Sequence, residues 1–258
     1  MKKMPFISWC WMLAMFIGLC GPGYTADTVE LKTEFQETEP KYLKNSDGSF
    51  GGLCVDLLRL IEQKSKYRFK YPQDFVPTKR LHQNLENRQT DVHCGLALSA
   101  EREQVLRYGV PLYTVQLLVA VRADDTIHVQ GLDDIRRLGE HGRILTPMGT
   151  ATYDYLVEQG GLLVDDGGKT PDKNLEKLES KRGRFFFYQS LNLLYEIHKA
   201  KNQGKFKVLP ASFRDYDHWM VFSKALDDAI VNDILEVISA VKATPEYQEI
   251  VDRYLKVE

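Results

Sequence analysis

Short apolar runs alternate with amphipathic stretches along most of this chain, and this order restricts the fold more than any other feature. Runs rich in β-branched and aromatic residues are typical of strands, and apolar residues three and four apart are typical of helices. The first half is predicted to contain strands at 29–32, 67–71 and 91–98, with helices beginning after Gly52 and covering 78–87. This order predicts a parallel α/β layer.

A run of high strand propensity, YTVQLLVAV at 113–121, interrupts the alternation, which then restarts. Two α/β units therefore follow one another, joined by an extended run near residue 115 and rejoined near 216. The second half is predicted to contain helices at 132–138, after 149–152, from 170 and at 190–200, strands at 143–145, 162–164, 184–188, 206–209 and 219–222, and two final helices.

Residues 1–26 have the plan of a secretory signal peptide. Lys2 and Lys3 precede an uncharged apolar run at 6–19, and Ala26 offers a small residue for cleavage. The apolar run is shorter than the ~20 residues that span a bilayer. Cys20 leaves a lipoprotein as one alternative, and an uncleaved anchor is another. We expect export to the periplasm.

Composition excludes several classes of protein. The 34 basic residues include Lys2 and Lys3, which leaves 32 against 36 acidic residues, so no surface for nucleic acid is expected. Outside the signal segment only Cys54 and Cys94 remain. An oxidising compartment suggests that they form one disulfide, with two buried free thiols as the alternative. The sequence has no paired C-x-x-C or H-x-x-x-H spacing, so no metal site is predicted, and no cofactor is expected.

The stretch at 91–113 contains the best candidate for a ligand site. An apolar run broken by Gly95 is followed by Ser99, a hydroxyl cap before an acidic first turn, and by Arg102. Glycine lets a ligand approach the backbone, and a guanidinium offers a planar fork that suits a carboxylate. The alternative is a surface arginine on an ordinary helix.

This stretch also carries a resemblance. GLALSAER at 95–102, with Tyr108 and PLY at 111–113, resembles the "G-x-x-x-T-x-E-R … F-S-x-P-Y" core of family 3 extracellular solute-binding proteins, the amino-acid-type periplasmic receptors of ABC importers. GLCVDL at 52–57 is similar to that family's "G-F-D-x-D-L".

The resemblance implies the type II periplasmic binding protein fold, with two α/β lobes joined by a two-crossover hinge. The hinge is expected at 113–116 and 215–218. Lobe 1 would comprise 27–114 and 216–258, and lobe 2 would comprise 115–215. In this topology the first and third strands are neighbours, which places both thiols at the cleft end of lobe 1 and predicts a Cys54–Cys94 bond.

The resemblance also implies roles for single residues. Arg102 would grip a ligand carboxylate, next to Gly95 and Ala97. GTAT at 149–152 resembles the family's "G-T-x" segment, so Thr150 and Ala151 would share that carboxylate at a helix N-terminus; a plain turn and cap is the alternative. In the family an aspartate in the second lobe usually holds the ligand ammonium, and here Gln189 stands in its place.

Further contacts are less specific. Arg80, near the start of the helix at 78–87, could face the cleft, or it could lie on a solvated helix surface. Tyr42 and Phe75 could stack on a ligand, although aromatic residues more often belong to the core. Glu37 and Glu39 could compensate for the missing aspartate, with solvated loop acids as the alternative.

The sequence therefore predicts a monomeric protein that captures a small carboxylate-bearing solute, an amino acid or related organic acid, in an interlobe cleft. Its partner would be an ABC permease or a membrane sensor. One alternative is a non-binding scaffold. Another is an exported enzyme similar to cyclohexadienyl dehydratase, with Glu37 or Glu39 as proton donor, although no nucleophile–base pair is visible.

Overall fold

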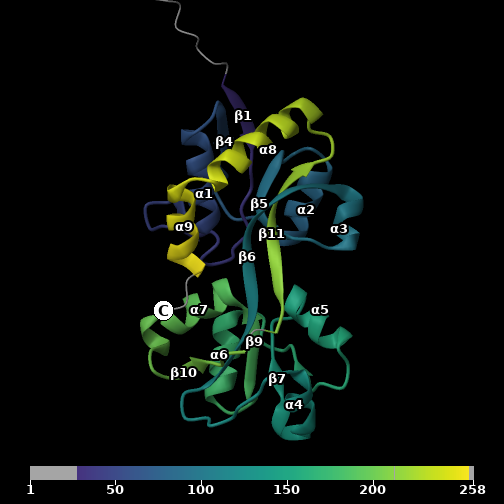
Figure 1. Ribbon diagram of the computed structural model, residues 1–258, viewed down its shortest axis with the longest axis vertical. Helices are drawn as coiled ribbons and strands as arrows, with labels where there is room; N and C mark the ends of the chain where they lie inside the picture. Colours follow the sequence, from purple (N-terminus) through teal and green to yellow (C-terminus); the bar gives the residue numbers. More distant parts are fainter. Residues whose placement is uncertain (1–27, 212, 256–258) are drawn as a thin grey trace, which may run out of the picture.

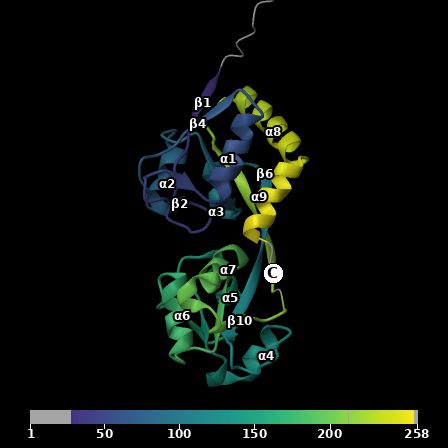
Figure 2. The ribbon, with the colours of Figure 1, turned by 90° about the vertical axis from the view of Figure 1, so that its left-hand side faces the viewer.

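A computed structural model describes residues 28–211 and 213–255. The chain forms two lobes, which can be distinguished in two perpendicular views (Figures 1 and 2). The expected α/β architecture with two lobes is therefore present. The predicted signal peptide lies outside the described residues. Among those described, no helix is both long enough and apolar enough to span a bilayer.

The strands of the first lobe form both parallel and antiparallel pairs, in separate sheets. β1 (Val29–Lys32) pairs in parallel with β4 (Tyr67–Lys70), and Thr33 forms a parallel bridge to Val92 at the start of β5 (Val92–Ala97). The first and third strands of the predicted layer are thus neighbours. The hairpin β2 (Leu43–Lys44) and β3 (Phe50–Gly51) and five helices complete the lobe: α1 (Leu53–Gln63), α2 (Thr78–Glu86), α3 (Ala100–Val105), α8 (Asp228–Lys242) and α9 (Pro245–Leu255).

The second lobe has helices on both faces of its sheet. β9 (Phe185–Gln189) is apolar at nearly every position because Phe185 and Phe187 pack into one core cluster while Phe186 and Tyr188 pack into another. The other strands are β7 (Ile144–Leu145), β8 (Val164–Asp165) and β10 (Phe206–Val208). The helices are α4 (Leu132–Arg137), the 3₁₀ turn η1 (Gly139–Gly142), α5 (Ala151–Glu158), α6 (Pro171–Glu179), α7 (Ser190–His198) and η2 (Ala200–Asn202).

Two long antiparallel strands connect the lobes. β6 (Leu106–Arg122) and β11 (Asp215–Ser223) pair across the waist of the molecule, where Tyr113 lies opposite His218 and Gln116 opposite Asp215 (Figure 1). β6 begins earlier than the strand run predicted at 113–121, and β11 includes the crossover expected at 215–218. The proposed lobe boundaries fall within this ladder.

The lobes also meet beside the hinge. Leu191 of α7 packs into the core cluster of the first lobe. Lys199 Nζ donates to the Glu39 carboxylate at 2.9 Å, and the Asn192 amide donates to the Glu39 carbonyl. The two lobes are therefore in direct contact where α7 meets the loop that contains Glu39.

The disulfide prediction is confirmed. Cys54 in the first turn of α1 is bonded to Cys94 in β5, with 5.7 Å between their Cα atoms. Because both residues are fully buried, the bond fixes α1 against the sheet in the interior of the first lobe.

Candidate functional site

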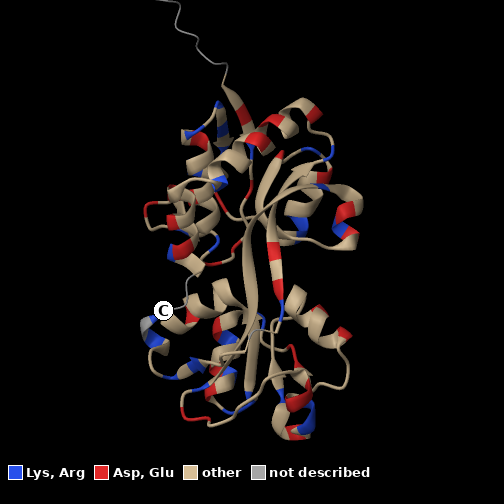
Figure 3. Cartoon of the chain, in the orientation of Figure 1, with Lys and Arg blue, Asp and Glu red and all other residues tan. Residues whose placement is uncertain are grey.

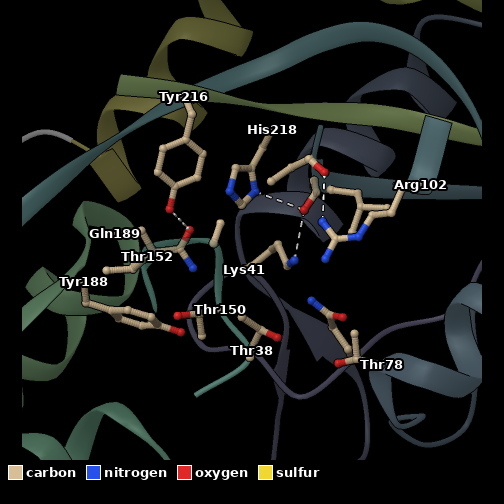
Figure 4. A pocket seen from close by; sticks show the side chains of 16 residues that line it. Thr38, Lys41, Thr78, Arg102, Thr150, Thr152, Tyr188, Gln189, Tyr216 and His218 are labelled. Carbon is tan, nitrogen blue, oxygen red and sulfur yellow. Dashed lines mark hydrogen bonds between the residues drawn. The ribbon is translucent and has the colours of Figure 1, made fainter. Parts of the chain in front are cut away.

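A cavity of about 200 Å³ lies between the lobes, at the hinge. Side chains from both lobes and from β11 point into it (Figure 4). Its lining comprises Gln36, Thr38, Lys41, Thr78, Gly95, Leu96, Ala97, Arg102, Gly149, Thr150, Ala151, Thr152, Tyr188, Gln189, Tyr216 and His218.

Gly95 is the anchor of the first-lobe wall. Its φ is +82°, and a Cβ there would lie 2.4 Å from the Tyr113 hydroxyl and 2.8 Å from Cys54 Sγ, so no other residue fits without rearrangement. The register between β5 and β11 shifts at this glycine, as in a β-bulge. Its carbonyl accepts hydrogen bonds from Lys41 Nζ and from His218 Nδ1, each at 3.0 Å.

Arg102 enters the cavity from the first turn of α3. Ser99 caps that helix, its Oγ accepting the Arg102 backbone N–H at 3.3 Å, as predicted. The guanidinium donates to the Ala97 carbonyl at 3.1 Å, and this bond fixes its orientation. A guanidinium has five N–H donors, so most remain free for a ligand.

Lys41 is a second cation in the same wall and is only 3% exposed. Burial, together with the nearby positive charge of Arg102, lowers the pKa of Lys41 from 10.5 to about 7. Lys41 is therefore close to half protonated at neutral pH when the cavity holds no anion.

His218 contributes a neutral acceptor. Because its Nδ1 faces the Gly95 carbonyl, Nδ1 carries the proton and donates, which leaves the lone pair on Nε2. Burial, and then the charge of Lys41, lowers the pKa of His218 to about 3, so the ring stays neutral. Its Nε2 has no hydrogen-bond partner within the described chain, and neither has Oε1 of Gln36. Buried polar atoms of this kind are costly unless a ligand or water satisfies them.

The second-lobe wall has no charged side chain. Thr150 caps α5, its Oγ accepting the Tyr153 N–H at 3.2 Å, so the first N–H groups of the helix open toward the cavity. Tyr216 donates to Gln189 Oε1 at 3.4 Å, and burial raises the pKa of Tyr188 to about 12. Acidic and basic residues are spread over both lobes (Figure 3), so the positive character of the cavity is local.

The structure brings together six of the residues selected from the sequence. Those lining the cavity are Gly95, Ala97, Arg102, Thr150, Ala151 and Gln189.

Three other selected residues lie outside the lining. Tyr42 is fully buried in the first-lobe core, where its hydroxyl donates to the Cys94 carbonyl at 2.6 Å. Phe75 packs against Phe50, and Arg80 is exposed on α2. The acids Glu37 and Glu39 are also exposed and do not line the cavity.

Sequence reasoning missed Lys41, Tyr216 and His218 as site residues. Lys41 precedes Tyr42, which was selected from the sequence, but nothing nearby in sequence indicates that the Lys41 side chain turns inward. Tyr216 and His218 are two residues apart on β11, so their side chains lie on the same face of the strand. Assigning residues 215–218 to a strand would have predicted that both face the cavity. In the described part of the chain, no group of three or more His, Cys, Asp or Glu side chains is arranged to hold a metal ion.

Residues 31–257 match the family model described as bacterial extracellular solute-binding proteins, family 3. No curated protein sequence matches the chain closely enough to count as a relative.

Solved structures share the fold at low sequence identity. The GluR0 ligand-binding core from Nostoc punctiforme in complex with L-glutamate has a TM-score of 0.69 and 18% identity, covering 88% of this chain and all of that one. An ABC transporter binding component from Wolinella succinogenes complexed with lysine has a TM-score of 0.71 and 15% identity, covering 90% and 97%. A histidine kinase sensor domain has a TM-score of 0.71 and 18% identity, covering 89% and 96%.

Proposed function

Because the chain belongs to family 3 of the bacterial extracellular solute-binding proteins, we propose that it captures a small carboxylate-bearing solute between its lobes. The observation that carries this proposal is that Arg102 and the N-terminus of α5 line one cavity from opposite lobes. The captured solute is delivered to a partner in the membrane, either an ABC permease or a sensor.

The chemistry of the two walls supports this role. A guanidinium binds a carboxylate through parallel charge-assisted hydrogen bonds, and the free N–H groups of a helix N-terminus bind the same anion from the other side. A ligand held by both walls stabilises the closed arrangement, and the paired strands β6 and β11 are placed to act as its hinge.

The enzyme alternative lacks its proton donor in the cavity. Its lining contains no aspartate or glutamate, Glu37 is exposed, and Glu39 is paired with Lys199. The scaffold alternative does not account for the unpartnered polar atoms of Gln36 and His218 beside two cations.

Thermal unfolding of the purified protein tests the proposal. The protein is screened with amino acids, mono- and dicarboxylates and opines, with uncharged amides and sugars as controls. At least one carboxylate is expected to raise the melting temperature, since ligand at 100 times its Kd stabilises by about 2.7 kcal/mol. Titration calorimetry should then give one site per chain. If no carboxylate stabilises the protein, the proposal is wrong and the scaffold reading is favoured.

A further inference from the structure

We propose that the preferred ligand is a small dianion with two acidic groups and no ammonium, and that Lys41 binds the second acidic group. This inference rests on the proposed function and adds the class of ligand and a residue that determines it. It would make Lys41 the partner of Arg102 in the first-lobe wall, with the N-terminus of α5 opposite.

The charges of the cavity favour two negative charges on the ligand. Its lining contains two cationic side chains, Lys41 and Arg102, and no carboxylate. Like charges that share a site repel each other, and each lacks a counter-ion there. A monoanion would neutralise only one of them, whereas a dianion neutralises both.

The two cations are also held as separate binding points. Lys41 Nζ is fixed on the Gly95 carbonyl and the Arg102 guanidinium on the Ala97 carbonyl, two residues further along β5. Figure 4 shows the Lys41 and Arg102 side chains extending into the same cavity. This arrangement suits acidic groups at the two ends of a short carbon skeleton.

An ammonium group finds no charged partner in this cavity. Gln189 occupies the wall where an acid would be needed, and it is already bonded by Tyr216. The free acceptors, Gln36 Oε1 and His218 Nε2, are neutral, so they suit a ligand hydroxyl. An ammonium would instead be repelled by Lys41 and Arg102.

Binding of a dianion is expected to take up a proton on Lys41. The titratable groups around Lys41 are Arg102 of α3, His82 of α2, His93 of β5, Tyr113 of β6, His218 of β11 and the adjacent Tyr42. Burial lowers the pKa of all three histidines and raises that of both tyrosines, so Arg102 is the charged member of the set. A bound carboxylate opposes both causes that lower the Lys41 pKa.

The sign of the pH dependence follows. Well below pH 7 Lys41 is already charged in the free protein, and the affinity reaches its full value there. Above about pH 7 the proton must be taken from solvent, so the affinity for a dianion falls about tenfold per pH unit until the pKa of the complex is reached.

Titration calorimetry at pH 6.5 with succinate, malate, aspartate and butyrate tests the inference. The first three share a four-carbon diacid skeleton and differ only in carrying hydrogen, hydroxyl or ammonium at C2. Succinate and malate are expected to bind at least tenfold more tightly than aspartate or butyrate. Lys41→Met should weaken succinate by about 30-fold or more and change butyrate by less than about threefold. Lys79→Met, an exposed lysine at the start of α2, should change neither.

Two further measurements keep the test independent of folding defects. Lys41→Met should melt no lower than the wild type at pH 6.5, because it removes a buried charge. Wild-type succinate binding at pH 8, measured in HEPES and in Tris, should take up close to one proton, while butyrate takes up none.

The outcomes separate the two proposals. If butyrate binds as tightly as succinate, or if Lys41→Met binds succinate as tightly as the wild type does, the role of Lys41 is wrong and the carboxylate receptor stands. If aspartate binds most tightly, the exclusion of ammonium is wrong. If none of these or any other carboxylate binds, both proposals fail together.

Discussion

The two walls of the cavity are built on different principles. The first-lobe wall contains both cations, Lys41 and Arg102, each fixed on a backbone carbonyl. The second-lobe wall offers hydroxyls, an amide and a helix N-terminus, all without formal charge. If the proposed function is right, this difference predicts that the first lobe attracts and holds the anion and that the second lobe closes on the bound anion.

The walls differ in stiffness as well. Gly95 in the first wall is enclosed by Tyr113, Cys54 and Lys41, and a disulfide lies directly beneath it. Gly149 in the second wall has nothing within 4 Å of its Cβ position, and the neighbouring Met148 is 64% exposed. The rigid wall therefore carries the charge, and the open wall is free to adjust during closure.

Removal of the Arg102 charge is the strongest test of this contrast. Arg102→Leu is expected to weaken the best carboxylate ligand by about 100-fold or more, because loss of a desolvated charge pair costs about 2–5 kcal/mol. Arg80→Leu is the matched control, since Arg80 is exposed on α2, and it should bind normally in titration calorimetry. A loss of less than threefold for Arg102→Leu would mean that the first wall does not hold the anion.

Loss of the disulfide should destabilise the first lobe more than the second. The disulfide joins residues 40 positions apart and so restricts the unfolded chain. Without it, the Cys54→Ser/Cys94→Ser double variant is expected to lose about 2–4 kcal/mol of unfolding free energy, measured in urea. Amide hydrogen exchange should localise the lost protection to α1 and β5, while β7 and β9 change little. Equal losses in both lobes would show that the rigid wall and the open wall unfold as one unit.

Placing an acid in the neutral wall gives the smallest expected effect. Gln189→Glu adds a carboxylate opposite Lys41 and Arg102, and should shift the succinate-to-aspartate affinity ratio toward aspartate by about tenfold, or 1.4 kcal/mol. Gln203→Glu adds the same charge at an exposed position of the second lobe and serves as the control. If both variants shift the ratio equally, overall charge rather than the wall decides the preference.

The fold was predictable where local patterns and tertiary packing agree. Ser99 and Thr150 were selected as helix starts, and each caps its helix through its hydroxyl. The strands of the hinge were harder to predict. The strand run was predicted at 113–121, yet β6 begins at Leu106, and Pro111 lies within it opposite Trp219, where the register shifts around the missing N–H. Residues 215–218 look polar, but pairing with β6 makes them a strand.

The site was only half predictable for a related reason. Arg102 and Thr150 sit in local motifs, whereas Lys41 is turned inward by a carbonyl 54 residues away and His218 by one 123 residues away. Such long-range hydrogen bonds leave no periodic trace in the sequence. Tyr42 illustrates the opposite error, since an aromatic residue beside the cleft proved to be core.

The Gly95 carbonyl makes the charge of the first-lobe wall independent of its geometry. Lys41 and His218 both donate to this oxygen. If Lys41 is replaced by a neutral residue, the Gly95 carbonyl keeps its hydrogen bond from His218, and the first-lobe wall keeps its structure. The charge offered at position 41 can therefore be changed without changing position 95, where a Cβ would lie 2.4 Å from the Tyr113 hydroxyl.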